Sequence, residues 1–234
     1  MTVLDEFADP RTRLALGIAG MAATAVAVRR DRVGRRETRV FRAVNGLPDA
    51  LFGPAWVVMQ LGTLAAAPAA AGVALALRER TLARRLLVGG TASWALSKVV
   101  KQGIRRPRPA ALLPDAQRRG QDAAGLGYLS GHAAVAVALG TAVLPRLAGP
   151  RRTVVLGLVP VVGLCRIYVG AHLPLDVLGG AAMGLAIEAA VGLWTGEPRE
   201  GRRPRERRLV SSTGSRAAKA LAGGLPGGMT TEAG

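Results

Sequence analysis

The sequence predicts an all-α polytopic membrane protein, a six-helix transmembrane bundle, and two observations support that fold class. Half of the 234 residues are hydrophobic but only 3% are aromatic, so the apolar mass consists of Ala, Leu, Val and Gly. These residues gather into long runs with few charges, which is typical of transmembrane helices. The net charge of +17 falls mainly between these runs and after the last one.

Six apolar runs approach the length of a membrane span. A span needs about 20 residues, because the hydrocarbon core is about 30 Å thick and a helix rises about 1.5 Å per residue. The runs cover residues 14–28, 52–77, 86–100, 130–147, 153–169 and 173–194. The first run is short and rich in Ala and Gly, so an interfacial helix or a buried helix is the alternative for it.

The chain divides into a membrane domain and a tail. We expect residues 1–195 to form the six-span domain and residues 196–234 to form a basic, disordered cytoplasmic tail. The Arg residues of 199–208 suit an anchor on anionic lipid. Loop charges place both termini in the cytoplasm, although the seven Arg residues of the 29–42 segment then face outward, against the usual rule.

The basic charge does not favour nucleic acid as a partner. Nucleic-acid binding predicts basic residues interleaved with aromatics on a soluble fold, and here they flank apolar runs instead. Cys165 is the single cysteine, which excludes an intrachain disulfide, and we expect it to be a small buried residue. Glu188 lies in the last apolar run, where it either pairs across the bundle or faces a polar cavity.

Three short segments at the ends of spans contain the polar residues suited to catalysis. They are residues 101–109 (KQGIRRPRP), 129–132 (LSGH) and 165–176 (CRIYVGAHLPLD). In a six-span topology the third span ends, the fourth begins, the fifth ends and the sixth begins on one side of the membrane. The three segments are therefore predicted to meet at one membrane face.

The residue types in these segments predict a phosphate site. Lys101, Arg108 and Arg166 supply positive charge, and an Arg guanidinium matches two phosphate oxygens at once. Ser130 and Gly131 stand where a helix begins, and the free N–H groups and dipole of a helix N-terminus favour an anion.

Both histidines of the chain fall in the same segments. His172 and Asp176 are four residues apart and share a helical face, so the carboxylate can orient one imidazole nitrogen while the other attacks phosphorus. His132 can then donate a proton to the leaving oxygen. Two His and one Asp offer too few ligands for a usual metal site, so we expect no metal and no cofactor.

The three segments, in this order, resemble the phosphatidic acid phosphatase type 2 family, which shares its site with vanadium haloperoxidases and bacterial acid phosphatases. The family pattern is Lys-x6-Arg-Pro, Pro-Ser-Gly-His and Ser-Arg-x5-His-x3-Asp. The matching residues are Lys101, Arg108, Pro109, Ser130, Gly131, His132, Arg166, His172 and Asp176. Leu129 stands where the family has Pro, and Cys165 where it has Ser.

The resemblance implies a function. His172 would accept the phosphoryl group, His132 would be the acid, and the protein would be an integral lipid phosphatase of the plasma membrane with its site facing outward. The expected partners are membrane lipids and a lipid phosphate substrate such as a polyprenyl diphosphate or phosphatidic acid. Two alternatives stay open, a lipid phosphotransferase with the same site and a non-catalytic lipid-binding or transport protein. A second phosphate site is a further idea, formed by Arg105, Arg106, Arg118 and Arg119.

Overall fold

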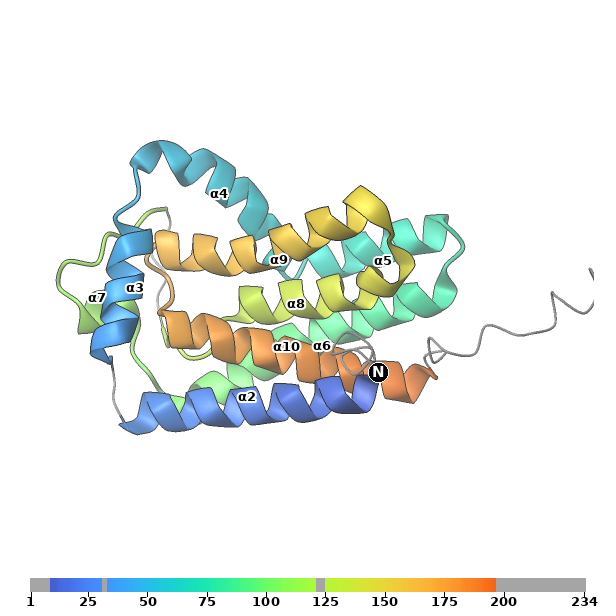
Figure 1. The fold of residues 1–234 in the computed structure, drawn as a ribbon, viewed down its shortest axis with the longest axis horizontal. Helices are drawn as coiled ribbons and strands as arrows, with labels where there is room; N and C mark the ends of the chain where they lie inside the picture. The colour runs from blue at the N-terminus through green and yellow to red at the C-terminus, as the bar shows by residue number, and fades with distance from the viewer. Residues whose placement is uncertain (1–8, 31–32, 121–124, 197–234) are drawn as a thin grey trace, which may run out of the picture. The chain divides into compact units, whose positions relative to one another are not determined.

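The computed structural model describes residues 9–30, 33–120 and 125–196, and all regular structure within these ranges is helical (Figure 1). The α-helices are α2 (Pro10–Arg30), α3 (Arg35–Asn45), α4 (Phe52–Met59), α5 (Ala66–Ala76), α6 (Arg80–Ile104), α7 (Pro109–Leu112), α8 (Gly131–Val143), α9 (Gly149–Tyr168) and α10 (Pro174–Thr195). Short 3₁₀ turns are η1 (Asp49–Leu51), η2 (Gln60–Gly62) and η3 (Leu144–Arg146). The predicted tail lies outside the described residues from position 197 onward.

All six predicted apolar runs contain helix, which confirms the all-α class. Within the described residues, α2 and α10 are long and apolar enough to cross a membrane, and the α4–α5 pair adds a third candidate if it is one span. The other runs fall short by length or charge, since α8 has only 13 residues and α9 carries Arg151, Arg152 and Arg166. Hydropathy within the described residues therefore supports up to three of the six spans.

The second predicted span is not a straight helix. The segment Asp49–Gly62 meets Ala66–Ala76 at an angle of 68°. Pro68 lies in the first turn of α5, and a helix continuing through it would lose a hydrogen bond and clash with the carbonyl group of Leu64. Gly62 at the bend packs so closely on α8 that a Cβ atom there would lie 2.6 Å from the carbonyl oxygen of His132.

Helix α3 lies between the first two apolar runs, where the sequence predicts a connecting loop. Its buried residues Glu37, Phe41 and Asn45 recur every four positions, so they form one face, and α3 packs this way against α9 and α10. The four Arg residues of the helix are exposed. Because α3 has only 11 residues and several charges, hydropathy along the sequence does not reveal it.

Helix α10 lies at the centre of the bundle and packs against α2, α6, α8 and α9 (Figure 1). Gly180 and Gly184 face α8 one turn apart, and a Cβ atom at either position would overlap a backbone carbonyl oxygen of α8 or of Ser130 just before it. Small residues at such spacing let two membrane helices approach closely. The contact fixes where α8 begins relative to where α10 begins.

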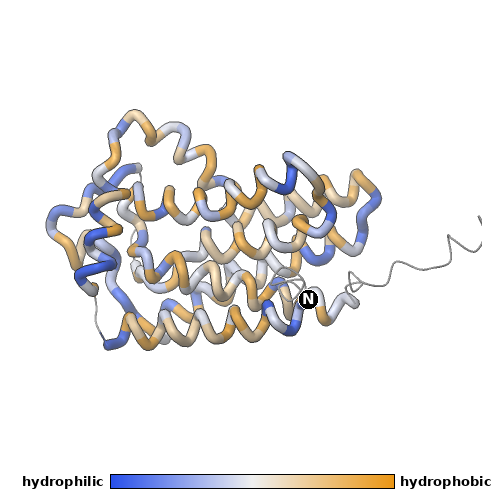
Figure 2. The backbone as a smooth tube through the Cα atoms, in the orientation of Figure 1, coloured by the Kyte–Doolittle hydropathy of each residue, from blue (hydrophilic) through white to orange (hydrophobic). Residues whose placement is uncertain are grey.

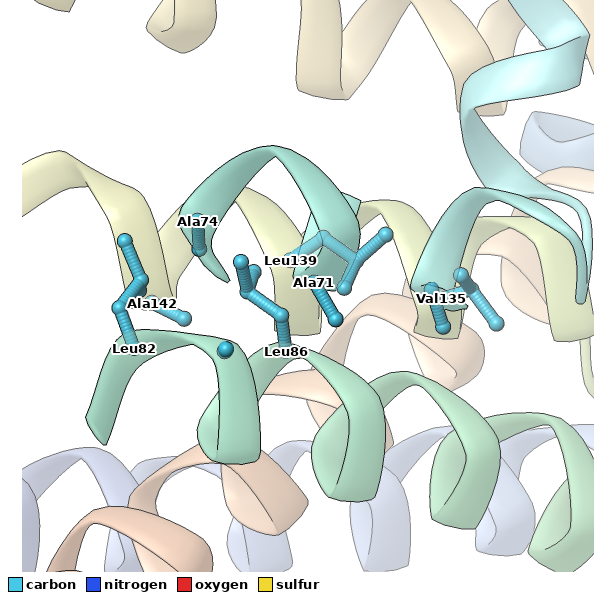
Figure 3. Packing of buried hydrophobic residues seen from close by; sticks show 9 residues of the cluster. Ala71, Ala74, Leu82, Leu86, Val135, Leu139 and Ala142 are labelled. Atoms are coloured by element: carbon cyan, nitrogen blue, oxygen red, sulfur yellow. The ribbon is translucent and has the colours of Figure 1, made fainter. Parts of the chain in front are cut away.

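A cluster of small and branched side chains holds the bent pair to the bundle (Figure 3). Its members come from α5, α6 and α8 and include Ala71, Ala74, Leu82, Leu86, Val135, Leu139 and Ala142. Hydrophilic segments concentrate at the two ends of the bundle, with hydrophobic backbone between them (Figure 2). This banding is the pattern expected of helices that cross a hydrocarbon layer.

A buried ion cluster joins three helices at the end of the bundle opposite α3. Glu188 of α10 is only 1% exposed, pairs with Arg85 of α6, and lies 3.4 Å from the Nη2 atom of Arg13 of α2. Of the two expectations for Glu188, pairing across the bundle is therefore confirmed. Two arginines sharing one carboxylate lock α2 and α6 onto α10.

Replacing Glu188 with Ala should destabilise the protein by about 3–5 kcal/mol, because two buried guanidinium groups would lose their shared partner. Thermal or denaturant unfolding in detergent measures the change. Glu79→Gln is the matched control, since Glu79 forms an exposed pair with Arg146 at 3.7 Å and its loss should matter little. Equal unfolding midpoints for the two variants would contradict the role of the cluster.

Two buried helical glycines provide a second test. Gly180→Ala should destabilise the protein by about 1–3 kcal/mol, because the new methyl group forces α10 away from the start of α8. Gly89→Ala in α6 adds the same methyl group where nothing lies within 4 Å. It should leave stability unchanged or raise it by up to about 1 kcal/mol. The close helix contact is refuted if the two variants unfold alike.

Candidate active site

The three polar segments come together at the end of the bundle where α3 and α7 lie (Figure 1). The backbone N–H of Ser130 donates to the carbonyl oxygen of Asp176 at 2.8 Å, which joins the second segment to the third. The Nη1 group of Arg108 donates a hydrogen bond to the carbonyl oxygen of Ala171 at 2.8 Å, which joins the first segment to the third.

His172 lies in the tight turn between α9 and α10. The backbone N–H groups of Ala171 and His172 both donate to the carbonyl oxygen of Arg166, and Pro174 then starts α10. Gly170 has a φ of +72°, and a side chain there would also overlap the carbonyl oxygen of Gln117. Glycine is therefore required at this position for the turn to form.

The imidazole of His172 faces the carboxylate of Asp176. The Nδ1 atom lies 3.7 Å from Oδ2 of Asp176, beyond hydrogen-bond length, and makes no other hydrogen bond. The same Oδ2 accepts the backbone N–H of Leu173 at 2.9 Å, which fixes the carboxylate at the start of α10. Catalytic hydrogen bonds are often long before substrate binds, so a contraction of about 0.7 Å would complete this pair.

His172 is only 2% exposed, and this burial has an electrostatic consequence. Burial lowers the pKa of His172 to about 3, the Asp176 carboxylate works in the opposite direction, and the positive charges of Lys101 and Arg166 add to the lowering. The imidazole is therefore neutral at neutral pH, as a nucleophile must be.

The cations Lys101, Arg108 and Arg166 lie close enough together to interact electrostatically. Lys101 donates to the carbonyl oxygens of Leu126 and Gly127 at 3.1 and 3.2 Å. The Nε atom of Arg166 is buried and has no hydrogen-bond partner, and its Nη1 contacts the sulfur of Met59 at 3.4 Å. A buried guanidinium N–H without an acceptor is costly, so it indicates that an anion completes the site.

The second segment supplies a helix N-terminus to the site. Ser130 caps α8, and its hydroxyl oxygen accepts the backbone N–H of Ala133 at 3.4 Å. Gly131 is the first residue of the helix, and a Cβ atom there would lie 2.9 Å from Oγ of Ser97. His132 follows, lines the cavity described next, and lies close enough to His172 for the two imidazoles to interact electrostatically.

A cavity of about 980 Å³ opens beside these groups. His132, Arg108 and Arg166 line one part, and the aromatic side chains of Phe52 and Trp56 from α4 line another. Among the described residues that line it, none is acidic. The volume lies at the upper end of the range for small-molecule sites, about 300–1,000 Å³. The cavity can thus hold an anionic group and part of an attached apolar chain.

Sequence reasoning missed a buried ion network behind His172. Arg106 donates from Nη1 to Oδ1 of Asp176 at 2.7 Å, and from Nη1 and Nη2 to the two carboxylate oxygens of Glu37 at 3.1 and 2.6 Å. Glu37 also accepts the backbone N–H of Leu175 at 2.9 Å. All three side chains are buried. Glu37 lies 69 residues from Arg106 in a charged segment, where no short-range pattern marks it.

The four arginines considered for a second phosphate site have different positions. Arg106 is bound to the two carboxylates, as above. Arg119 donates to Asp49, to Gln117 and to the carbonyl oxygens of Asn45, Leu47 and Tyr168, and its guanidinium stacks 4.4 Å from the Tyr168 ring. These contacts hold the loop before the site, and Arg119 also lines the cavity, so a second phosphate site there stays a prediction. Arg118 lines the cavity, and Arg105 is exposed at the end of α6.

Two further expectations concern Cys165 and metal ions. Cys165 is 8% exposed within an apolar cluster, which confirms it as a small buried residue. Among the described residues, no group of three or more His, Cys, Asp or Glu side chains is arranged to hold a metal ion.

Comparison with known proteins identifies the family and the fold of the chain. No curated protein matches the chain in sequence. A transmembrane PAP2-type phosphatidylglycerolphosphate phosphatase from Bacillus subtilis has a similar structure, with a TM-score of 0.61, 21% identity, and coverage of 80% of this chain and 99% of that one. LpxE from Aquifex aeolicus has a TM-score of 0.56 and 21% identity, with coverage of 66% and 93%. The sequence model of the PAP2 superfamily matches residues 82–199, which is half of the chain and includes all three segments. The chain belongs to the PAP2 superfamily and has the fold of its transmembrane phosphatases.

Proposed function

We propose that the protein is a membrane lipid phosphatase that hydrolyses a phosphomonoester or diphosphate of a lipid through a phosphohistidine intermediate on His172. The observation that supports this most is the grouping of the buried, neutral His172 with the positive charges of Lys101 and Arg166. This group lies beside a cavity lined by His132, Arg108 and Arg166, and the buried Nε of Arg166 has no hydrogen-bond partner. Family membership and the fold agree with it.

In the first step, the phosphate occupies the space between Lys101, Arg108 and Arg166. Their charges, with the N–H groups at the start of α8, stabilise the negative charge that spreads over the phosphoryl oxygens. The Nδ1 side of His172 faces Asp176, so Nε2 attacks phosphorus. The bond between phosphorus and the leaving oxygen breaks, and His132 donates a proton to that oxygen. The leaving oxygen belongs to the lipid in a phosphomonoester and to the remaining lipid phosphate in a diphosphate.

In the second step, water displaces the imidazole. His132, now without its proton, accepts one from the attacking water as the phosphorus–nitrogen bond breaks. The bound phosphate carries negative charge, which favours the protonated form of His132 at the start of each cycle. Asp176 opposes the positive charge that the imidazole of His172 acquires while it carries phosphate.

The walls of the cavity favour an amphiphilic substrate. Phe52 and Trp56 extend the cavity away from the cations, and Trp56 is 53% exposed on the outer face of α4, where a lipid chain would lie. A polyprenyl diphosphate or a phosphatidic-acid-like lipid fits this division between charged and apolar walls. The structural relative from Bacillus subtilis is described as acting on phosphatidylglycerolphosphate.

The site is proposed to face outward from the plasma membrane. The start of α2 and the end of α10 lie together at the opposite end of the bundle (Figure 1). That end also has the basic segments 78–85 and 146–152, which the usual charge rule places in the cytoplasm.

Replacing His172 with Ala should lower phosphate release by about 10³-fold or more, because no other residue can carry the phosphoryl group. The assay uses purified protein with a polyprenyl diphosphate, phosphatidic acid and phosphatidylglycerol phosphate in detergent micelles. Asp115→Asn is the control, because the Asp115 carboxylate is exposed and pairs with Arg42. This variant should keep wild-type activity. Activity should also persist in EDTA.

Three outcomes of that assay would argue against the proposal. Wild-type phosphate release by His172→Ala removes the mechanism, and inhibition by EDTA indicates a metal. Transfer of labelled phosphate to a lipid alcohol instead of water identifies a phosphotransferase. Rapid quenching of the wild-type reaction should trap an acid-labile, base-stable phosphoprotein that His172→Ala lacks.

Protonation of His172 should not lower kcat/KM near pH 6.5, the usual pKa of histidine. The nucleophile must be neutral, and the lowered pKa of about 3 keeps it neutral until the pH falls toward that value. The profile is measured between pH 4.5 and 8 with a monophosphate and a diphosphate lipid, so that limbs caused by substrate ionisation move with the substrate. An acid limb near pH 6.5 common to both substrates would contradict a buried neutral His172.

A further inference from the structure

The network behind His172 contains one more carboxylate than is needed to neutralise its arginine. Glu37 and Asp176 bind the same guanidinium of Arg106, and all three side chains are at most 8% exposed. Taken by themselves, these three side chains carry two negative charges and one positive charge. Among the described residues, Glu37 pairs with no cation other than Arg106.

Glu37 matters because Arg106, paired with Asp176 alone, would cancel the negative charge of Asp176. Arg106 donates to Oδ1 of Asp176 at 2.7 Å, while Oδ2 faces Nδ1 of His172. With only these two ions, the arginine would neutralise the carboxylate that must oppose the charge developing on the imidazole. Glu37 binds Arg106 through two oxygens and so satisfies the arginine from the opposite side.

Glu37 also fixes where the carboxylate stands. It accepts the backbone N–H of Leu175, and Asp176 accepts the N–H of Leu173, so the two acids together satisfy donors at the first turn of α10. Negative charge is favourable at a helix N-terminus. Helix α3 is therefore fastened to the turn that presents His172.

We propose that Glu37 and Arg106 are positioning residues for the phosphoryl transfer: they hold Asp176 in place, and Glu37 offsets the charge of Arg106 so that Asp176 keeps its negative charge toward His172. This rests on the proposed function of the site. Neither residue touches the phosphate; both act through Asp176. A helix outside the predicted spans thus contributes to the rate of the reaction.

The test compares Glu37→Gln, Arg106→Gln and the double variant in micellar phosphate-release assays with phosphatidic acid and a polyprenyl diphosphate. Each single variant should lower kcat by about 10–100-fold with little change in KM, because the phosphate contacts remain while the charge opposite the imidazole is altered. In the double variant Asp176 again faces His172 with one net negative charge. Its kcat should exceed that of either single variant by at least about 3-fold.

A matched ion pair on the same helix controls for loss of structure. Arg42 of α3 binds Asp115 at 2.7 Å in the open, so Arg42→Gln and Asp115→Asn break an ion pair between α3 and the same connecting loop, away from the site. Both controls should keep the wild-type kcat. Unfolding midpoints are measured for all variants, and the proposal requires a fall in kcat for Glu37→Gln even at temperatures well below its midpoint.

The results separate this inference from the function on which it rests. If His172→Ala is inactive but Glu37→Gln has the wild-type kcat, the positioning role is overturned and the proposed function stands. The positioning role is also overturned if the fold-losses in kcat of the two single variants multiply in the double variant. An equal loss of kcat in Arg42→Gln overturns it as well. Wild-type release by His172→Ala would remove the proposed function itself.

Discussion

The site depends on how the Asp176 carboxylate is held at the start of α10. One oxygen accepts from Arg106, the other accepts from the backbone of Leu173 and faces His172, and the backbone carbonyl of the same residue accepts from Ser130. The aspartate thereby joins three stretches of chain that are far apart in sequence. Burial makes each of these bonds costly to break, because an unpaired charge in a low-dielectric interior is strongly unfavourable.

The helix packing makes this convergence possible. Gly180 and Gly184 let α10 approach α8 until backbone meets backbone, which sets the start of α8 beside the turn that carries His172. At the opposite end Glu188 pairs with two arginines, so α10 is tied to its neighbours at both ends by buried ions. In a bilayer, where apolar contact between helices gains little over contact with lipid, close packing and buried polar pairs determine how helices associate.

Positive charge predominates at the site. Lys101, Arg108 and Arg166 crowd together, and the one nearby carboxylate is already shared with Arg106. A phosphate dianion would relieve this repulsion and supply an acceptor for the buried Nε of Arg166. The same unbalanced charge would stabilise negative charge on the transferring phosphoryl group, so the features that bind the substrate also favour the reaction.

The all-helical class, the apolar runs and the three polar segments could be read from the sequence, because hydrophobic periodicity and motif spacing are local properties of the chain. The residues proposed for the site follow from those segments. The bend at Gly62, the pairing of Glu188 and the role of Glu37 could not be read in this way, since each depends on contacts with residues distant in sequence. Glu37 looks like any charged residue in an Arg-rich segment until folding brings Arg106, 69 positions away, against it. The sequence alone determined which chemical groups the protein carries, and the tertiary structure decided which of them share their charges, because pairing between distant residues depends on how the helices pack.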